Sequence, residues 1–545
     1  MNARQRVAVV TGGGGGIGGA IAEELGRAGW FVVTVDPLVT LEGTEELPEP
    51  ATTTAGRIVA AGGSARSSSA SVTDGAALRA LFEELAGEHG GLDAVVNVAG
   101  ITRQSYFARG TEDDWQALLS VHLGGYLNVL DAALPLMAEA GHGRIVGVTS
   151  GSGWRGADAG AYSCAKRAVA ALTWQLGRHA PPGVTVNALS PIANTRMVVA
   201  AVERARQEGR AGGGGGLSLD SMPGPEQLGP LGAHLVDDGF GWCTGQVVFA
   251  SGPEVAIVDQ PRLLEVVRTA GAVSLPALVQ AFVPRALVKA EAKQVSAGGG
   301  NPRFAGIFDA PTSGPFPAPA TKSCIVVVDG RTQLEAPLLA ALDARSISCH
   351  RVESGRGFDG AAGSLRAVVD AEGPVDAVVI ALDGHRASSP TNAGWETILA
   401  DHEGLVEHLH ADAAWPRAVA EYAARADRPV QLMTLTDATT PGGKSRAQAA
   451  GQLARAAESG TGGRVTAFAT SVEAPDALAG PVVGELVGQL FVDPEAAALA
   501  GAELVVGPGW LGLRSHPRPL GTVTYGGPAV PTWLDDTLKE MVGAP

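Results

Sequence analysis

The sequence predicts an α/β protein with two doubly wound parallel-sheet domains in tandem. Its 545 residues exceed the ~100–200 residues of one ordinary domain. Short β-branched runs alternate with amphipathic stretches over residues 6–250, a rhythm typical of a parallel sheet with helices on both faces. The same alternation begins again after Lys322. We therefore expect three segments, namely a first α/β domain at residues 1–255, an extension with a Gly/Pro-rich linker at 256–321, and a second α/β domain at 322–545.

Six runs of apolar and β-branched residues are the expected strands of the first domain. They are Arg6–Thr11, Phe31–Asp36, Leu92–Asn97, Gly143–Ser150, Val184–Leu189 and Gln246–Phe249. Because amphipathic stretches separate most of these runs, we expect parallel strands joined by helices. The glycine-rich stretch Gly212–Gly216 interrupts the pattern, and a flexible segment such as a lid is expected there.

The composition indicates a globular protein with an acidic surface. Hydrophobic residues make up 45% of the chain, and 40 basic against 56 acidic residues give a net charge of −16. Such a surface repels phosphates, so neither nucleic acid nor a membrane is an expected partner. The four cysteines lie far apart without a CxxC pair, and no metal site is expected. With no leader-like N-terminus and no apolar run near the ~18 residues of a membrane span, a cytoplasmic location is expected.

A glycine-rich turn follows the first expected strand. The sequence Thr11-Gly-Gly-Gly-Gly-Gly-Ile-Gly18 stands between that strand and an amphipathic helix. In this context glycines let backbone amides approach a pyrophosphate at the N-terminus of the helix. A glycine run also occurs in simple linkers, but a linker requires neither a preceding strand nor an apolar residue such as Ile17 pointing into a core. The turn is therefore the expected dinucleotide-binding site.

The second expected strand ends at an acidic residue, Asp36. A carboxylate at this position accepts hydrogen bonds from ribose hydroxyls and repels a 2′-phosphate. No Lys or Arg lies within Gly12–Gly16 to neutralise such a phosphate. The pattern favours NAD over NADP as the cofactor. The alternative is that Asp36 is an ordinary solvated loop acid.

Further motifs follow in order along the first domain. They are Asn97-Val-Ala-Gly100 after the central strand, Ser150, Tyr162-Ser-Cys-Ala-Lys166 and Asn187-Ala-Leu-Ser-Pro191. Together with the glycine-rich turn they resemble the short-chain dehydrogenase/reductase family over residues 5–255. The resemblance implies a Rossmann fold around a nicotinamide cofactor. The positions that we expect against the cofactor are Gly12, Gly16, Ile17, Gly18, Asp36, Val72, Asn97, Ala99, Gly100, Tyr162, Lys166, Pro191, Ile192 and Thr195.

The expected catalytic pair is Tyr162 and Lys166, which share one helix face at i and i+4. An ammonium near a phenol stabilises the phenolate and makes tyrosine a usable base. The resemblance implies that Tyr162 exchanges a proton with the substrate oxygen during hydride transfer, that Lys166 also holds the ribose, and that Ser150 hydrogen-bonds the reacting carbonyl. Because Ser150 is one place closer to the tyrosine than is usual in the family, Thr149 and Ser152 remain alternative donors.

A histidine, His122, occupies the place where the family usually has an asparagine of a water-linked proton path. An imidazole both donates and accepts, so His122 is a further candidate catalytic residue, with a titration expected near the ordinary histidine range. A histidine packed structurally in a helix bend is the other interpretation, and both stay open. At the adenine side, Ser71 replaces the acidic residue of many relatives, which leaves that contact open.

The substrate is less clearly indicated. Val121–Gly125 and Ser190–Met197 weakly resemble the (3R)-hydroxyacyl-CoA dehydrogenase part of peroxisomal multifunctional enzymes. This resemblance implies a 3-hydroxyacyl or 3-ketoacyl thioester, carried on CoA or a carrier protein, with Arg196, Arg204 or Arg206 available for phosphate contacts. These arginines are also explained as solvated helix charges. A ketoreductase of a polyketide, steroid or other cyclic substrate is an alternative, and an NAD-binding sensor or scaffold without turnover is a third.

The second half of the chain is a weakly similar repeat of the first half. Four stretches of the second half, which begin at Cys324, Val375, Gly394 and Val430, resemble four stretches of the first half and follow in the same order. In this alignment Gln448 and Gln452 stand in the places of Tyr162 and Lys166, and Asp437 stands in that of Ser150. We therefore expect a degenerate domain without cofactor or catalytic motifs. Because family members commonly pair through two helices, we also expect an intramolecular pseudo-dimer, with further pairing to a homodimer left open.

Overall fold

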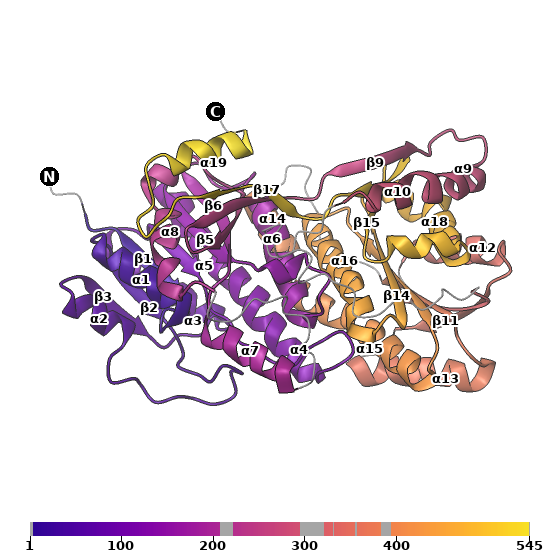
Figure 1. Ribbon diagram of the computed structural model, residues 1–545, viewed down its shortest axis with the longest axis horizontal. Helices are drawn as coiled ribbons and strands as arrows, with labels where there is room; N and C mark the ends of the chain where they lie inside the picture. The colour runs from indigo at the N-terminus through magenta and orange to yellow at the C-terminus, as the bar shows by residue number, and fades with distance from the viewer. Residues whose placement is uncertain are drawn as a thin grey trace.

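The computed structural model describes residues 4–207, 222–294, 321–330, 332–354, 357–382 and 394–543. These residues form two sheets, each flanked by helices, which lie side by side along the long axis of the molecule (Figure 1). The expected α/β class with two domains is confirmed. The flexible segment expected at Gly212–Gly216 lies outside the described residues, as do residues 295–320 of the extension and linker expected at 256–321.

The first sheet has nine strands in the order β17-β8-β7-β6-β5-β4-β1-β2-β3. The strands are β1 (Val7–Thr11), β2 (Phe31–Val35), β3 (Ser64–Ser68), β4 (Ala94–Asn97), β5 (Gly143–Val148), β6 (Val184–Pro191), β7 (Val247–Ser251), β8 (Glu254–Asp259) and β17 (Arg518–Thr524). Strands β1 to β7 are parallel, and β8 and β17 are added antiparallel at one edge. All six expected strands are present, with bounds that differ by at most two residues.

Helices cover both faces of the first sheet. Val7 and Val9 of β1 belong to the core on one face, whereas Ala8 and Val10 belong to the core on the other. This alternation follows from the pleat of a strand, and burial on both faces explains why these strands are continuously apolar. The helices of this domain are α1 (Gly16–Arg27), α2 (Thr54–Ala60), α3 (Gly75–His89), α4 (Glu112–Leu119), α5 (Gly125–Ala140), α6 (Gly160–Leu176), α7 (Arg196–Gln207) and α8 (Gly229–His234).

The second sheet has eight strands in the order β11-β10-β12-β13-β14-β15-β16-β9. The strands are β9 (Leu263–Arg268), β10 (Ser323–Val328), β11 (Ser348–Glu353), β12 (Ala377–Leu382), β13 (Val430–Asp437), β14 (Val465–Val472), β15 (Glu503–Gly507) and β16 (Trp510–Arg514). The order matches that of the first sheet, except that the described residues contain no counterpart of β3. Its longer helices are α12 (Glu335–Asp343), α13 (Gly357–Glu372), α14 (Trp395–Asp401), α15 (Leu405–Ala426), α16 (Pro441–Thr461) and α18 (Pro481–Val492), and a four-residue helix, α17 (Pro475–Leu478), precedes α18.

Each sheet ends on a strand from the other part of the chain. Strand β9 follows β8 but pairs with β16 in the second sheet, and β17 follows β16 but pairs with β8 in the first. After β17 the chain continues to α19 (Leu534–Val542), the yellow helix that lies over the first domain in Figure 1. Helices α9 (Leu275–Phe282) and α10 (Val288–Glu291) pack on the second domain. The sheets therefore do not separate at the expected boundaries near residues 255 and 322.

The two domains share a core. Helix α6 packs against α16, and α4 packs against α15, so that apolar side chains of both domains form one continuous cluster. Polar contacts also cross the interface between the two domains, and two of them involve side chains of α6. The Arg167 guanidinium lies 2.6 Å from a Glu503 carboxylate oxygen, with both side chains largely buried, and the Gln175 amide donates to Ser445 Oγ at 2.9 Å.

One helical stretch, Glu112–Ala140, combines α4, a π-helical turn at Ser120–Gly124 and α5. By length and composition alone it is long and apolar enough to cross a membrane, contrary to our expectation that no apolar run would approach that length. However, 61% of its apolar window is buried inside the fold, and it packs against α3 and α6. These features are those of a core helix.

Candidate active site

The glycine-rich turn brings the end of β1 close to the end of β4. Gly12 has φ +63°, and a Cβ atom on it would lie 2.9 Å from the backbone of Ala99. A Cβ atom on Gly18 would lie 2.3 Å from the Gly12 carbonyl oxygen, and Gly16 has φ +54°. Side chains at these positions would therefore be strained or would collide with backbone. The bare turn leads directly into α1, which is the geometry that a pyrophosphate requires.

The Asp36 carboxylate lies against this turn. It follows the last residue of β2 and accepts hydrogen bonds from the backbone amides of Gly14 at 3.1 Å and Leu38 at 2.9 Å. The carboxylate is thus fixed at the rim of the turn, on the side that β2 supplies. A ribose hydroxyl there would meet a hydrogen-bond acceptor with a negative charge.

The remaining expected cofactor positions lie at the carboxyl ends of the parallel strands or just beyond them. Thr11 Oγ1 donates to Asn97 Oδ1 at 2.6 Å and accepts from the amide of Ala99, which ties the end of β4 to that of β1. Val72 is buried beyond β3. Pro191 ends β6, the Ile192 amide donates to the Ala250 carbonyl, and Thr195 accepts a hydrogen bond from the Val198 amide at the start of α7. This edge of a doubly wound sheet is where ligands bind.

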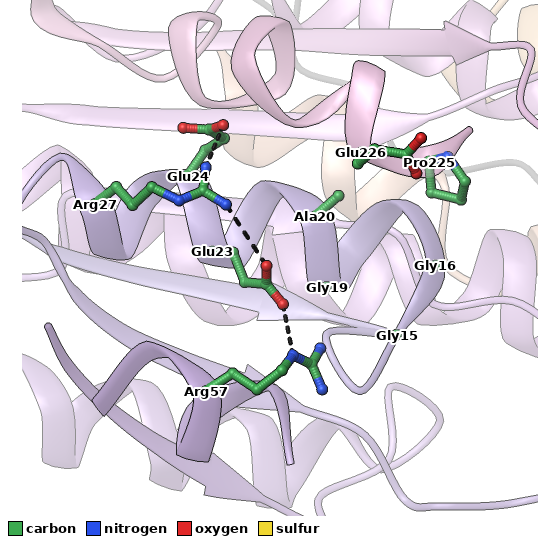
Figure 2. Close-up of a pocket in the computed structure, with 10 residues that line it drawn as sticks. All are labelled: Gly15, Gly16, Gly19, Ala20, Glu23, Glu24, Arg27, Arg57, Pro225 and Glu226. Atoms are coloured by element: carbon green, nitrogen blue, oxygen red, sulfur yellow. Dashed lines mark hydrogen bonds and ion pairs between the residues drawn. The ribbon is translucent and has the colours of Figure 1, made fainter. Parts of the chain in front are cut away.

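A pocket of about 210 Å³ lies outside the turn and extends along α1 from Gly16 to Arg27 (Figure 2). Two arginines reach it, Arg27 and Arg57. Figure 2 shows that Arg57 donates to Glu23 at 2.8 Å and that Arg27 pairs with both Glu23 and Glu24. The charges of these two arginines are therefore already balanced by carboxylates.

Tyr162 and Lys166 lie on one face of α6, as expected from their spacing. Lys166 Nζ is 5.6 Å from the centre of the Tyr162 ring and donates to the Val148 carbonyl at 2.6 Å. Burial lowers the pKa of Lys166 to about 7. Burial also raises the pKa of Tyr162, and a hydrogen bond with Ser150 and the positive charge of Arg155 partly oppose that rise.

Among the three candidate donors after β5, Ser150 is the one at the phenol. Thr149 Oγ1 donates to the Lys166 carbonyl at 2.6 Å, so it is committed to the backbone of α6. Ser152 Oγ accepts a hydrogen bond from Arg155 at 2.9 Å. Ser150 begins a short 3-10 turn, Gly151–Gly153, and its Oγ accepts from the Ser152 amide at 3.2 Å. The shortened spacing to the tyrosine does not displace the serine from the site.

His122 lies in the π-helical turn between α4 and α5, and its ring stands edge-on to the Tyr162 ring. Its Nε2 is 2.8 Å from the Ile101 carbonyl oxygen, whereas its buried Nδ1 has no hydrogen-bond partner among the described residues. Burial, and then the positive charge of Lys166, lower the pKa of His122 to about 3. The expected titration near the ordinary histidine range is therefore wrong, because the sequence does not reveal how completely the ring is buried.

The corresponding residue of the second domain is His402, which follows Trp395 by the same seven positions that separate His122 from Trp115. His402 is fully buried, and both of its ring nitrogens are satisfied. Nδ1 is 2.6 Å from the Ile398 carbonyl oxygen and Nε2 is 2.8 Å from Ser445 Oγ. His122 Nδ1 therefore lacks a partner of the kind that both ring nitrogens of His402 have.

Two further residues at this site, Arg155 and Gln452, were not predicted as site residues from the sequence. Arg155 affects Tyr162 through its charge, and Gln452 of α16 hydrogen-bonds the loop that carries Arg155. The guanidinium of Arg196 lies 3.9 Å from the position of a Cβ atom on Gly15, beside the glycine-rich turn. Arg196 was expected to be available for phosphate contacts, but its closeness to the turn has no sequence signal. The side chains of Arg204 and Arg206 lie outside the described part of the structure.

A bare glycine turn at the carboxyl edge of a doubly wound sheet, with a tyrosine and a lysine on the adjoining helix, defines a dinucleotide-dependent oxidoreductase. The family model for short chain dehydrogenases matches residues 6–206. Nodulation protein G of Azospirillum brasilense is 32% identical over 256 residues, which are 46% of this chain and 97% of that protein. The chain belongs to the short-chain dehydrogenase/reductase family, and it is an oxidoreductase acting on CH–OH or keto groups with a nicotinamide cofactor.

Other similar proteins cover the same part of the chain. The hydroxyacyl-CoA dehydrogenase ChsB1 of Mycobacterium tuberculosis is 33% identical over 274 residues, which are 47% of this chain and 81% of that protein. Among solved structures, a short chain dehydrogenase from Mycobacterium avium is 30% identical, with 52% of this chain and 94% of that chain covered and a TM-score of 0.41.

Proposed function

We propose that this protein is an NAD-dependent oxidoreductase that interconverts a secondary alcohol and a ketone, with Tyr162 as the acid/base group. The observation that carries the proposal is the meeting of Tyr162, Lys166 and Ser150 at the carboxyl edge of the first sheet. A tyrosine buried without a hydrogen-bond partner or a neighbouring cation would be too weakly acidic for this role. Here both are supplied, which supports proton transfer rather than dinucleotide binding alone.

Each side chain has a defined part in the proposed reaction. The nicotinamide, when bound, supplies or accepts the hydride. In the direction of oxidation the Tyr162 oxygen takes the proton of the substrate hydroxyl, and in reduction it returns a proton to the carbonyl oxygen. Ser150 donates a hydrogen bond to the same substrate oxygen, where negative charge develops. Lys166 donates to the Val148 carbonyl, and in its protonated form its positive charge stabilises the Tyr162 phenolate.

His122 extends this arrangement, because its ring packs edge-on against the Tyr162 ring. His122 Nε2 contacts both the Ile101 carbonyl oxygen at 2.8 Å and the Ile101 amide at 3.3 Å. We assign the proton to Nε2 because the contact with the carbonyl is the shorter one, and the neutral ring then keeps an acceptor at Nδ1. Both ring nitrogens of His402, in contrast, have hydrogen-bond partners. We therefore assign His122 to the proton path of Tyr162, as a neutral acceptor rather than as a titrating group.

NAD is proposed over NADP on the basis of Asp36 and of the paired arginines. A 2′-phosphate at the rim of the turn would face the Asp36 carboxylate, while Arg57 is bound to Glu23 at 2.8 Å. Repulsion by Asp36 disfavours the phosphorylated cofactor, and Arg57, which is already paired with Glu23, does not offset that repulsion.

The proposed substrate class is a 3-hydroxyacyl or 3-ketoacyl thioester. Its support is the similarity to ChsB1 and to an acetoacetyl-CoA reductase of Allochromatium vinosum, which is 31% identical over 243 residues. The first test is a hydride-transfer assay with acetoacetyl-CoA and with a panel of cyclic ketones. Turnover that disappears in Tyr162→Phe supports the enzyme, whereas NAD binding without turnover of any compound supports a sensor instead.

For the second domain we propose a degenerate, cofactor-free role in an intramolecular pseudo-dimer. Gln448 and Gln452 lie on α16 in the places of the catalytic pair, and Asp437 binds Thr439 instead of facing a phenol. The packing of α6 on α16 supports the pairing. A cytoplasmic location is supported by four cysteines that are all free thiols.

A further inference from the structure

The second domain reaches into the loop between Ser150 and Tyr162. Gln452 of α16 donates hydrogen bonds from Nε2 to the Ser152 carbonyl at 3.1 Å and to the Arg155 carbonyl at 2.9 Å. The Gln452 side chain is only 2% exposed. One amide nitrogen carries two hydrogens, so these two carbonyls use its full donor capacity.

A second contact holds the same loop three residues before Ala159, at Gly156. Ser459 Oγ, two turns further along α16, donates to the Gly156 carbonyl at 2.7 Å. At Gly460 the helix backbone approaches so closely that a Cβ atom would lie 2.6 Å from Asp158 Oδ2. Asp158 in turn accepts hydrogen bonds from the amides of Phe107 and Gly160, at the start of α6. Residues 152–158 are therefore fixed from α16 at several points.

The loop that α16 holds sets the surroundings of the phenol. Ser150 precedes it, and Arg155 within it donates to Ser152 Oγ at 2.9 Å. The charged or titratable groups that face Tyr162 are Arg155 from this loop, Lys166 from α6 and His122 from the π-helical turn. Of these three, Arg155 alone depends on the second domain for the position of its backbone.

We propose that Gln452 is a positioning residue of the active site, through which the second domain holds the loop that places Ser150 and Arg155 around Tyr162. Gln452, at the position that corresponds to Lys166, thus supports the loop at residues 152–158 of the first domain. This inference rests on the proposed function of Tyr162. It accounts for the buried amide in α16, which would otherwise be an unusual residue for a helix interface.

The test is the variant Gln452→Met in the full chain, with Gln448→Met as the matched control on the same helix. Methionine keeps the length and packing of glutamine but donates no hydrogen bond, whereas the Gln448 amide binds Glu503 within the second domain. We expect Gln452→Met to lower kcat about tenfold, with an unchanged Kd for NAD. We also expect faster hydrogen exchange of amides 151–159 and a higher apparent pKa of Tyr162, because Arg155 is no longer fixed near it.

Wild-type exchange rates in residues 151–159 for Gln452→Met, or equal changes in Gln448→Met, would overturn the proposal. If Gln452→Met does not fold, Ser459→Ala tests the same support from a partly exposed hydroxyl and is expected to show a smaller change in the same direction. Failure of the proposed function has a different signature. A wild-type protein without turnover removes the kinetic readout, but the hydrogen exchange and an NMR titration of labelled Tyr162 still decide whether Gln452 positions the loop.

Discussion

The ring of His122 stands edge-on to the ring of Tyr162, with 5.0 Å between the ring centroids and 86° between the planes. This arrangement brings an imidazole with a free Nδ1 to the phenol of the proposed acid/base residue. The low pKa of about 3 keeps the imidazole neutral in the physiological range, so the ring can accept a hydrogen bond there without becoming protonated.

The first prediction concerns this neutral histidine. We expect a plot of log kcat/KM against pH to lack an inflection between about pH 5 and 7 that depends on His122. His122→Phe keeps an aromatic ring but removes the acceptor, and we expect it to lower kcat by about tenfold or more. His122→Asn, which retains an acceptor, is the matched variant and is expected to lose less. Equal kcat values for wild type and His122→Phe would leave His122 a packing residue.

The second prediction concerns stability and the buried lysine. Burial lowers the pKa of Lys166 from 10.5 to about 7, so between pH 7 and 10.5 the unfolded chain binds more protons than the folded one. The contribution of Lys166 therefore makes the free energy of unfolding rise as the pH rises through that window. Lys166→Met removes the cost of burying the charge, and we expect it to stabilise the protein at pH 6 to 7 by on the order of 2 kcal/mol.

Urea titrations of wild type and Lys166→Met at pH 6.5 and pH 9.5 measure this effect. The difference in the free energy of unfolding between wild type and Lys166→Met should be smaller at pH 9.5, because Lys166 is then mostly neutral in the folded protein. A difference that is the same at both values would show that Lys166 is not buried in its neutral form. Lys293, which is partly exposed, offers a control for the general effect of removing a positive charge.

The third prediction concerns the choice of cofactor. Asp36→Ala removes the carboxylate that accepts from Gly14, and we expect it to weaken NAD binding about tenfold while NADP binding improves. Isothermal titration calorimetry also gives the stoichiometry. We expect one site per chain, in the first domain. Two sites per chain would contradict a degenerate second domain, and an unchanged preference would show that Asp36 does not select the cofactor.

The fourth prediction concerns the exchanged C-terminal segment. Leu538 of α19 is fully buried in the core of the first domain, although it lies near the end of the chain. Leu538→Ala is expected to lower the free energy of unfolding by about 2–5 kcal/mol. Leu520 of β17 is 41% exposed, and Leu520→Ala should change the free energy of unfolding by less than about 0.5 kcal/mol. Loss of NAD binding together with unfolding in Leu538→Ala would connect α19 to the first domain in solution.

The sequence was most informative where chemistry requires fixed spacing. The glycines of the turn, Asp36 and the Tyr162–Lys166 pair could each be assigned, because a close backbone approach, a strand end and an i, i+4 relation all leave local patterns. Strand β3 was not predicted, since its sequence Ser-Ala-Arg-Ser-Ser contains little apolar character. A half-exposed strand at the sheet edge does not require apolar alternation.

What could not be predicted depends on contacts between distant parts of the chain. The pairing of β17 with β8 joins residues more than 250 positions apart, and the sequence of neither strand indicates with which other strand it pairs. The contact of Gln452 with the Arg155 carbonyl is likewise set by the packing of α16 on α6. The pKa of His122 follows from how many atoms surround the ring, which is a property of the assembled core.

The exchange of β9 and β17 also fixes how the two domains respond to dilution. Separate subunits associate only when their concentration exceeds a dissociation constant, so a weakly expressed enzyme of that kind is partly unassembled. Here each sheet is completed by a strand tethered to the other, and the effective concentration of one domain around the other is set by the chain itself. The pairing of the two domains is therefore independent of the protein concentration, unlike the pairing of two separate subunits.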